Sequence, residues 1–193
     1  MLISITGRLG SGKSTICNIM KEQYGYEIFS TGAIQREYAR NMGISTLELN
    51  LRMKENPQLD KEIDDTVTKI SIERCNENLI FDSRMAWHFA KNTFKIFLTI
   101  APEEAARRVM KNQRGEEEKY TDEKDACQKL VERSRVERER FIEIYGVDYY
   151  DFNNYNIVID TTSRTPEAVV ETIIENIKLY ADNPESFNSP RMI

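Results

Sequence analysis

The sequence predicts an α/β fold built on a mainly parallel β-sheet. Short apolar runs such as 2–6, 79–81 and 94–100 alternate along the chain with longer segments whose apolar residues recur every three or four positions. The first pattern is typical of buried strands and the second of amphipathic helices. Strands that are separated by helices usually pair in parallel, and ligands of such folds bind beyond the carboxyl ends of the strands. The residues that follow 2–6 and 79–81 are therefore expected to face one cleft.

The order of the predicted elements follows from these patterns and from the residues that bound them. Five strands are expected, over 2–6, 28–29, 79–81, 94–100 and 156–160. Helices are expected over 13–23, 31–40, 45–54, 57–74, from 102 onward, and over 121–146 and 165–180. Thr31, Ser45 and Thr121 are the predicted N-caps, because their hydroxyl groups can accept hydrogen bonds from helix N–H groups. Gly146 suits the end of the long charged helix.

Composition and charge limit the class of protein. A chain of 193 residues with 40% hydrophobic and 31% charged residues favours one globular domain, over 1–180, followed by a flexible or loosely docked tail over 181–193. The net charge of −5 argues against a protein whose main ligand is nucleic acid or anionic lipid. The partner is expected to be a small molecule, and the protein a monomer or a weak homo-oligomer.

Cysteine usage and hydropathy indicate the compartment. Cys17, Cys75 and Cys127 show no paired spacing and no accompanying histidines, so neither a disulfide framework nor a zinc site is expected. No apolar run is long enough to span a bilayer, and the N-terminus lacks the charged segment of a signal peptide. These features predict a cytoplasmic protein.

A phosphate-binding loop is the most specific local signal. Residues 7–14 read GRLGSGKS, which matches G-x-x-x-x-G-K-[ST] and lies between a predicted strand and a predicted helix. Its glycines allow successive N–H groups to point at phosphate oxygens, and the helix adds the positive end of its dipole. Lys13 is expected to reach the β- and γ-phosphates, and the Ser14 hydroxyl to bind Mg²⁺. The loop predicts ATP or GTP binding. Its expected contact residues are Gly7, Arg8, Leu9, Gly10, Ser11, Gly12, Lys13, Ser14 and Thr15.

Three further motifs carry a resemblance to a known family. STGAIQR at 30–36, FDSRMAW at 81–87 and ERSRVERER at 132–140, together with the phosphate loop, resemble the cytidylate kinase family of nucleoside monophosphate kinases, in particular its short archaeal-type branch. The resemblance covers nearly the whole chain. It implies a three-layer P-loop NTPase fold with a five-stranded parallel sheet, a helical acceptor-binding insertion over 33–74 and a helical lid over 110–140. It also implies ATP and Mg²⁺ as cofactors.

The resemblance assigns residues to the acceptor nucleotide. In that family an arginine on the helix entered through Ser-x-Gly grips the acceptor's phosphate, and Gly32 and Arg36 match this pattern. A second arginine, just beyond the third core strand, matches Arg84. A planar guanidinium suits this task because it can bind phosphate through two parallel hydrogen bonds. The resemblance also points to Asp60 and Asp64 as acceptors of a hydrogen bond from a base amine such as that of cytosine, with an acidic surface stripe as the alternative.

The last motif contains four arginines. At 3.6 residues per turn, Arg133, Glu137 and Arg140 share one face of a helix, whereas Arg135 and Arg138 point elsewhere. The family's lid uses two arginines and an intervening acid with this spacing to cover the transferring phosphates, so the resemblance implies Arg133, Glu137 and Arg140 as lid residues. Arginines placed there stabilise charge that spreads in the transition state. For Arg135 and Arg138, a solvated face with salt bridges is the alternative.

The expected reaction is phosphoryl transfer from ATP to a nucleoside monophosphate, with CMP or dCMP as the best match. Such an acceptor already carries an ionised phosphate oxygen near neutral pH, so positioning and charge neutralisation matter more than a base. The expected catalytic residues are Lys13, Asp82, Arg84, Arg133, Glu137 and Arg140. Together with Ser14, Asp82 is the expected Mg²⁺ ligand; in another interpretation it orients Lys13 or Arg84.

Two alternatives stay open for the reaction. In a P-loop kinase that phosphorylates a hydroxyl group of another small metabolite, Asp82 is the expected general base. A nucleotide-binding regulatory protein would keep the loop without productive transfer. Ser83 and Met85 stand where the family often carries glycine and, in its bacterial members, aspartate, so the identity of the acceptor stays open. His88 is expected to be structural or exposed, because transfer to a phosphate leaves it no proton to move.

Overall fold

The computed structural model of the protein describes residues 1–56, 58–112 and 119–193. Its centre is a sheet whose neighbouring strands are all parallel, in the order β2-β3-β1-β4-β5-β6. The strands are β1 (Leu2–Gly7), β2 (Glu27–Ser30), β3 (Leu79–Asp82), β4 (Thr93–Thr99), β5 (Ile157–Asp160) and β6 (Arg191–Met192). The predicted α/β fold with a parallel sheet is confirmed. The short strand β6 is an addition to the five strands expected from the sequence.

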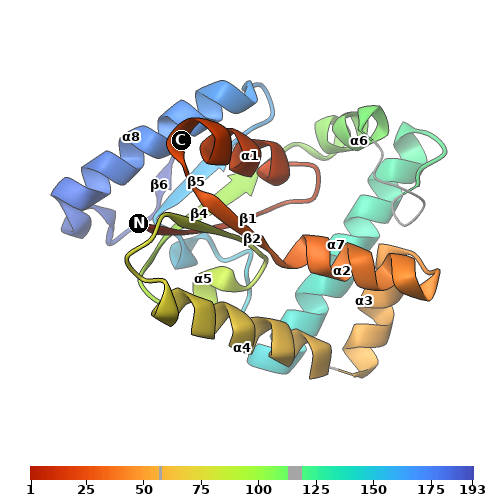
Figure 1. The fold of residues 1–193 in the computed structure, drawn as a ribbon. Coiled ribbons are helices and arrows are strands. Elements are labelled where there is room, and N and C mark those ends of the chain that lie inside the picture. The colour runs from red at the N-terminus through yellow and green to blue at the C-terminus, as the bar shows by residue number, and fades with distance from the viewer. Residues whose placement is uncertain (57, 113–118) are drawn as a thin grey trace.

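Helices cover both faces of the sheet and give the molecule three layers (Figure 1). They are α1 (Lys13–Tyr24), α2 (Thr31–Met42), α3 (Thr46–Glu55), α4 (Gln58–Glu73), α5 (Ala86–Phe89), α6 (Pro102–Lys111), α7 (Glu123–Tyr145) and α8 (Pro166–Asp182), with short 3-10 turns at η2 (Phe152–Asn154) and η3 (Pro184–Phe187). Among the described residues, no helix has both the length and the apolar character that a membrane span requires.

Alternate residues of the strands build a core on each face of the sheet. Ile96 and Leu98 of β4 belong to an apolar cluster that includes residues of α1 and α8. Phe97, which lies between them, belongs to a second cluster with Trp87 of α5 and Phe141 of α7. This alternation is what a strand covered on both faces requires. The strands β1 and β3 pair in parallel with Ile5 opposite Asp82, so their carboxyl ends lie next to each other, where the candidate site lies.

The predicted insertion and lid correspond to helices outside the central layers. The helices α2, α3 and α4 account for most of 33–74, and the end of α6 with the first three quarters of α7 accounts for most of 110–140. Figure 1 shows α7 running from the level of α6 down to the level of α4. Residues 113–118 of the predicted lid, and Pro57 at the predicted start of α4, lie outside the described residues. The roles of both segments stay predictions.

Two helices begin at a different cap from the predicted one. Ser30 rather than Thr31 caps α2, and Asp122 rather than Thr121 caps α7. In each case the capping side chain accepts a hydrogen bond from the N–H three residues later. The pattern alone does not separate two adjacent residues that both have capping side chains. The predicted cap of α3, Ser45, is confirmed.

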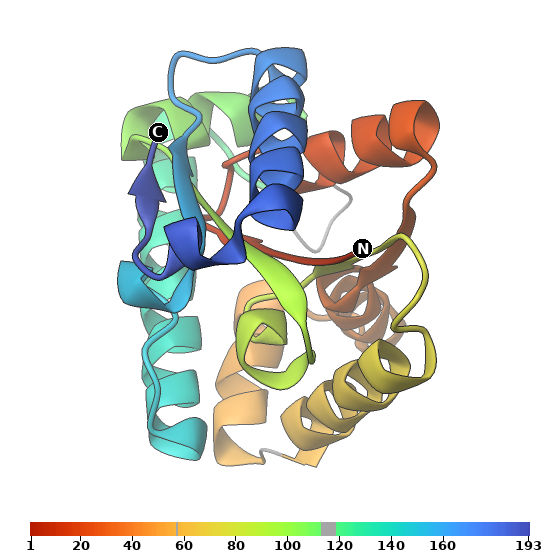
Figure 2. The same cartoon turned by 90° about the vertical axis from the view of Figure 1, so that its left-hand side faces the viewer.

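The tail differs from the sequence prediction, because it is packed against the sheet. Phe187 is 4% exposed, and its ring centroid lies 5.7 Å from that of Phe94 and 5.5 Å from that of Tyr180. Beyond it, β6 pairs with β5 at the edge of the sheet (Figure 2). The many polar residues of 181–193 conceal this docking, which depends on one aromatic residue and on an open strand edge.

Candidate active site

The phosphate loop joins the end of β1 to the start of α1, and its glycines are required by its geometry. Gly10 and Gly12 have φ angles of 79° and 86°, in the left-handed region that other residues rarely adopt. A Cβ atom at Gly10 would also lie 2.8 Å from the Cβ of Ala105 on α6. One at Gly7 would lie 2.6 Å from the carbonyl oxygen of Leu98 on β4. The loop therefore packs too closely against its neighbours for a side chain at either position.

The loop opens into a cavity of about 490 Å³. Its lining comes from the loop, α1, α2, α4, the segment after β3, α6, α7 and the segment between β5 and α8. We call the part lined by residues 9–16 with Arg108 and Thr161 the phosphate-loop end, and the part lined by Arg36, Asp60 and Asp64 the acidic end. All of the predicted site residues line this cavity, with the exception of Gly7, Arg8 and Arg140.

Gly7 and Arg8 contribute to the loop through their main-chain atoms. The carbonyl oxygen of Gly7 accepts a hydrogen bond from Nη1 of Arg84 at 2.9 Å. The N–H of Arg8 donates to the carbonyl oxygen of Leu98 at 2.9 Å and fixes the start of the loop to β4. The side chain of Arg8 lines a second cavity, of about 470 Å³, where its guanidinium carbon lies 5.7 Å from the centre of the Tyr150 ring. This side chain is therefore not placed to contact a phosphate held by the loop.

Asp82 ends β3 beside the loop. It is 7% exposed, and its Oδ2 accepts a hydrogen bond from the Ser30 hydroxyl at 3.0 Å. No cluster of three or more His, Cys, Asp or Glu side chains that could hold a metal ion is found within the described residues. Mg²⁺ at nucleotide sites takes one or two protein oxygens together with water and phosphate oxygens. Ser14 and Asp82 both line this cavity, and their side chains carry a hydroxyl and a carboxylate oxygen, so the pair fits such an ion.

Glu137 of α7 lies between two arginines that line the cavity. Its Oε2 accepts a hydrogen bond from Nε of Arg84 at 2.9 Å, and its Oε1 accepts one from Nε of Arg133 at 2.8 Å. Burial by itself raises the pKa of Glu137, but the positive charges of Arg84 and Arg133 outweigh it and lower the pKa to about 2. Glu137 is therefore ionised at neutral pH and holds both guanidinium groups at the cavity.

Arg140 lies on the same face of α7 as Arg133, as predicted, but outside the cavity. It is 1% exposed; its Nη1 donates to Oδ1 of Asn50 at 2.6 Å, and its Nε lies 2.9 Å from Oδ2 of Asp60. Seven residues advance a helix by about two turns, which brings Arg140 beneath α3 and α4. The resemblance implied a contact between Arg140 and the transferring phosphates, whereas in the structure its side chain contacts Asn50 and Asp60 outside the cavity. In the structure, Arg140 joins α7 to α3 and α4 through a buried ion pair.

The two carboxylates of α4 are buried, so the alternative of an acidic surface stripe is wrong. Asp60 is 3% and Asp64 is 5% exposed, and Oδ2 of Asp64 accepts a hydrogen bond from the Tyr145 hydroxyl at 2.6 Å. Burial raises the pKa of Asp60 to about 6, against the opposing charge of Arg140. Burial also raises the pKa of Asp64 to about 7, against the hydrogen bond from Tyr145. Asp64 therefore changes its charge near neutral pH.

The remaining predicted residues are placed as follows. Nη1 of Arg36 lies 3.3 Å from the position that a Cβ atom of Gly32 would take, so the Arg36 side chain folds back over the start of α2. Arg135 and Arg138 form exposed ion pairs with nearby acids, which confirms the alternative of a solvated face for both. His88 is exposed, in agreement with its expected lack of a chemical role.

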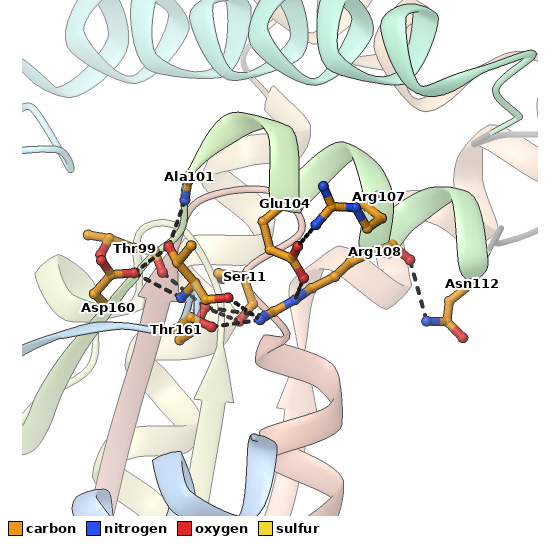
Figure 3. A network of polar contacts seen from close by, with 10 residues as sticks. Ser11, Thr99, Ala101, Glu104, Arg107, Arg108, Asn112, Asp160 and Thr161 are labelled. Atoms are coloured by element: carbon orange, nitrogen blue, oxygen red, sulfur yellow. Dashed lines mark hydrogen bonds and ion pairs between the residues drawn. The ribbon is translucent and has the colours of Figure 1, made fainter. Parts of the chain in front are cut away.

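The sequence prediction missed Arg108 and Thr161 at the phosphate-loop end. Nη2 of Arg108 donates to the carbonyl oxygens of Thr161 and Thr162 at 2.6 and 3.2 Å, and its Nε donates to Glu104 at 3.0 Å (Figure 3). A Cβ atom at Gly12 would lie 3.9 Å from Nη1 of Arg108. A planar guanidinium held beside the loop is suited to stacking on an aromatic base. The sequence did contain one indication of Thr161, because it directly follows a predicted strand and residues at strand ends face the cleft in such folds.

Comparisons with known proteins agree with this geometry. The model of the cytidylate kinase-like family matches residues 2–163. A cytidylate kinase from Methanocaldococcus jannaschii is 33% identical over 186 residues, which are 92% of this chain and 99% of that protein. An S-adenosylmethionine-dependent nucleotide dehydratase from Lacinutrix mariniflava is 36% identical over 177 residues, which are 90% of this chain but 35% of that protein. This chain thus spans about a third of the dehydratase's length.

A solved structure supports the fold. The shikimate kinase from Bacteroides thetaiotaomicron superposes with a TM-score of 0.60 at 13% identity, over 92% of this chain and 98% of that chain. At this identity the likeness shows the P-loop kinase fold alone. The family match extends over most of the chain and supports a nucleotide kinase in general terms. The family membership that the motifs predicted is therefore confirmed, and the chain belongs to the cytidylate kinase-like family.

Proposed function

We propose that this protein transfers the γ-phosphoryl group of ATP to a nucleoside monophosphate, with CMP or dCMP as the preferred acceptor and Mg²⁺ as the cofactor. The observation that carries the proposal is one cavity lined both by the phosphate loop and by Arg36, Arg84 and Arg133. A donor and an acceptor that each carry phosphate match these two cationic regions, because guanidinium groups bind phosphate through paired hydrogen bonds.

Transfer between two phosphates needs alignment and charge stabilisation more than it needs a base. Lys13 and the N–H groups of the loop hold the donor's phosphates. Arg84 reaches the acceptor's phosphate, because Glu137 and the carbonyl oxygen of Gly7 fix the orientation of its guanidinium. When bound, Mg²⁺ neutralises phosphate charge, and Ser14 and Asp82 are the residues that would hold it. No general base is required in this mechanism.

The acidic end supports an acceptor base that carries an amino group. Asp60 is already engaged by Arg140, whereas in the described part of the chain the hydrogen bond to Asp64 comes from Tyr145 and falls on Oδ2. An ionised Asp64 can accept a hydrogen bond from the amino group of cytosine, while uracil presents a carbonyl oxygen at the same place and is repelled. Asp64 is therefore the residue that we propose for discrimination between CMP and UMP.

The relatives support a nucleotide acceptor. The protein from Methanocaldococcus jannaschii, matched along almost its whole length, is named a cytidylate kinase. The protein from Lacinutrix mariniflava, matched along about a third of its length, is named a nucleotide dehydratase. Both names concern nucleotides, which favours a nucleotide over the hydroxyl acceptor of the alternative proposal. Asp82 would be the general base for such a hydroxyl acceptor, and its hydrogen bond from Ser30 is compatible with either role.

An acceptor panel tests the proposal. Purified protein is incubated with ATP and MgCl₂ and with CMP, dCMP, UMP, AMP, shikimate or a nucleoside, and the release of ADP is measured. ADP release with CMP or dCMP at least ten times faster than with the other acceptors is expected. Transfer to a hydroxyl acceptor alone would overturn the proposal and favour Asp82 as a base. Binding of ATP without transfer to any acceptor would favour a nucleotide-binding regulatory protein.

A further inference from the structure

The hydroxyl group of Thr161 connects the phosphate loop to Arg108. Thr161 follows β5 directly and is 1% exposed. Its Oγ1 lies 3.2 Å from the carbonyl oxygen of Ser11 in the loop and 3.0 Å from that of Thr99 at the end of β4. The same Oγ1 accepts a hydrogen bond from Nη1 of Arg108 at 3.4 Å. One buried hydroxyl thus joins the phosphate loop, the end of β4 and α6 (Figure 3).

Arg108 has few ways to move independently of Thr161. Its Nη2 donates to the carbonyl oxygen of Thr161 at 2.6 Å, and its Nε donates to Glu104 at 3.0 Å. The guanidinium is therefore held from both sides, with Gly12 of the loop as its neighbour. A ligand that orders or displaces Arg108 acts on Thr161 at the same time, and through it on the carbonyl group of Ser11.

The carbonyl group of Ser11 matters because of the peptide plane to which it belongs. The C=O of Ser11 and the N–H of Gly12 share one planar peptide unit, so a hydrogen bond that orients the C=O also orients the N–H. The N–H groups of such a loop are the ones that meet phosphate oxygens. The hydroxyl of Thr161 has one hydrogen and two carbonyl oxygens within reach, those of Ser11 and Thr99. The position of the Arg108 guanidinium can therefore decide which of the two carbonyl groups receives the hydrogen bond from the Thr161 hydroxyl.

We propose that Thr161 is a positioning residue that couples the binding of the donor's base at Arg108 to the orientation of the phosphate loop. This inference rests on the proposed function in one respect, namely that a nucleoside triphosphate occupies the phosphate-loop end. A base that stacks on Arg108 orders the guanidinium, and the hydroxyl of Thr161 then commits its hydrogen to Ser11. The base thereby increases the affinity of the loop for the phosphates, in addition to the affinity that its own contacts provide.

The test compares ATP with inorganic tripolyphosphate, which has the same phosphates and no base. Both dissociation constants are measured by isothermal titration calorimetry with MgCl₂ and without an acceptor. Thr161→Val keeps the shape of the side chain and removes the hydroxyl. It is expected to weaken ATP binding about tenfold, the loss typical of a buried hydrogen bond, and tripolyphosphate binding by no more than about twofold. Thr161→Ser, which keeps the hydroxyl, is expected to restore both constants.

Thr162→Val is the matched control. The hydroxyl of Thr162 accepts a hydrogen bond from the N–H of Ala101 at 2.9 Å and donates to Asp160 at 2.6 Å, and it contacts neither the loop nor Arg108. The ratio of the two dissociation constants is expected to be that of the wild type. Equal losses for ATP and tripolyphosphate in Thr161→Val, or no loss for either, would overturn the coupling.

A second variant keeps the inference testable if Thr161→Val does not fold. Arg108→Lys retains the charge but removes the planar group, and it is expected to weaken ATP binding selectively, again about tenfold, with tripolyphosphate binding unchanged within about twofold. A parallel loss for both ligands would contradict the coupling. Because no acceptor is present in these titrations, a failure of the acceptor panel to show transfer is a separate outcome that bears on the proposed function alone.

Discussion

At the phosphate-loop end of the cavity the shape is set by the main chain, whereas at the acidic end it is set by buried charges. The loop is fixed by hydrogen bonds such as that from the N–H of Arg8 to Leu98 and by the close approach of Gly10 to α6. The acidic end depends on the pair of Arg140 with Asp60, and Glu137 holds Arg84 and Arg133 in the region between the two ends. Removing one member of a buried pair leaves an uncompensated charge. Side-chain variants at the loop are therefore expected to lose activity alone, and those at the acidic end to lose stability as well.

The largest effect is expected for Lys13→Met at the phosphate-loop end. The variant keeps the length of the side chain and removes the charge that meets the donor's phosphates, so kcat/KM with CMP should fall by about 10³-fold or more. The free energy of unfolding in urea should change by less than about 0.5 kcal/mol. Lys21→Met, an exposed position on the same helix α1, is the control and should keep full activity. A variant of Lys13 that retains a tenth of the activity would contradict the role of the loop.

Arg140→Met tests the acidic end through stability. The variant leaves the carboxylate of Asp60 buried without its partner, and the free energy of unfolding should fall by about 3 kcal/mol. Arg135→Met breaks an exposed pair on the same helix and should cost less than about 1 kcal/mol. Urea unfolding at pH 7 measures both. A stable Arg140→Met protein with a large loss of kcat would instead support the catalytic role that the resemblance implied for Arg140.

The phosphate loop could be predicted from the sequence because its geometry is local. The spacing of its glycines and of Lys13 within eight consecutive residues carries the whole motif, and the strand and helix that flank it follow from periodicity. The placement of Asp82 and Arg84 beside it follows from a general rule on strand ends in parallel sheets. These parts of the site needed no knowledge of how distant helices cross.

The acidic end could be predicted only in part, because it depends on those crossings. Helical spacing correctly put Arg133 and Arg140 on one face of α7, yet one lines the cavity and the other is buried under α3 and α4. The spacing of residues along α7 does not indicate which part of that helix is covered by α3 and α4. Thr161 was missed for a related reason, since its importance comes from three carbonyl and guanidinium partners supplied by other segments. Phe187 likewise docks the tail through partners that are remote in the sequence.

Arg84→Ala distinguishes the two ends through binding. Arg84 lies between them, since it contacts the carbonyl oxygen of Gly7 and the carboxylate of Glu137. If its main task is to hold the acceptor's phosphate, the KM for CMP should rise about 30-fold while the dissociation constant of ATP changes less than about threefold. Initial rates at varied CMP and calorimetry with ATP give the two values, and Arg135→Ala is the control. Equal losses for both ligands would count against an acceptor role.

The smallest effect is expected from the protonation of Asp64. Its pKa is about 7 in the folded protein against a usual value of 3.8, so between these pH values the folded state binds more protons than the unfolded state, and stability falls as the pH rises. The wild type should therefore lose about 2 kcal/mol of unfolding free energy from pH 5 to pH 8 through this group. The pKa of Asp60 is also raised, so Asp60 adds to this loss in the wild type and in an Asp64→Asn variant alike. The difference in unfolding free energy between wild type and variant therefore isolates Asp64.

Asp64→Asn should remove that part of the pH dependence while keeping a group that can accept the hydrogen bond from Tyr145. Urea unfolding at pH 5 and pH 8 measures it, with Asp65→Asn, an exposed neighbour on α4, as the control that should follow the wild type.

The variant Asp64→Asn also separates stability from recognition, because an amide can both accept and donate a hydrogen bond. If Asp64 reads the base, the wild type should prefer CMP over UMP at pH 8, where Asp64 is ionised, and this preference should shrink in Asp64→Asn at the same pH. A retained preference would place base recognition elsewhere at the acidic end and leave Asp64 with a structural role beside Tyr145 and Arg140.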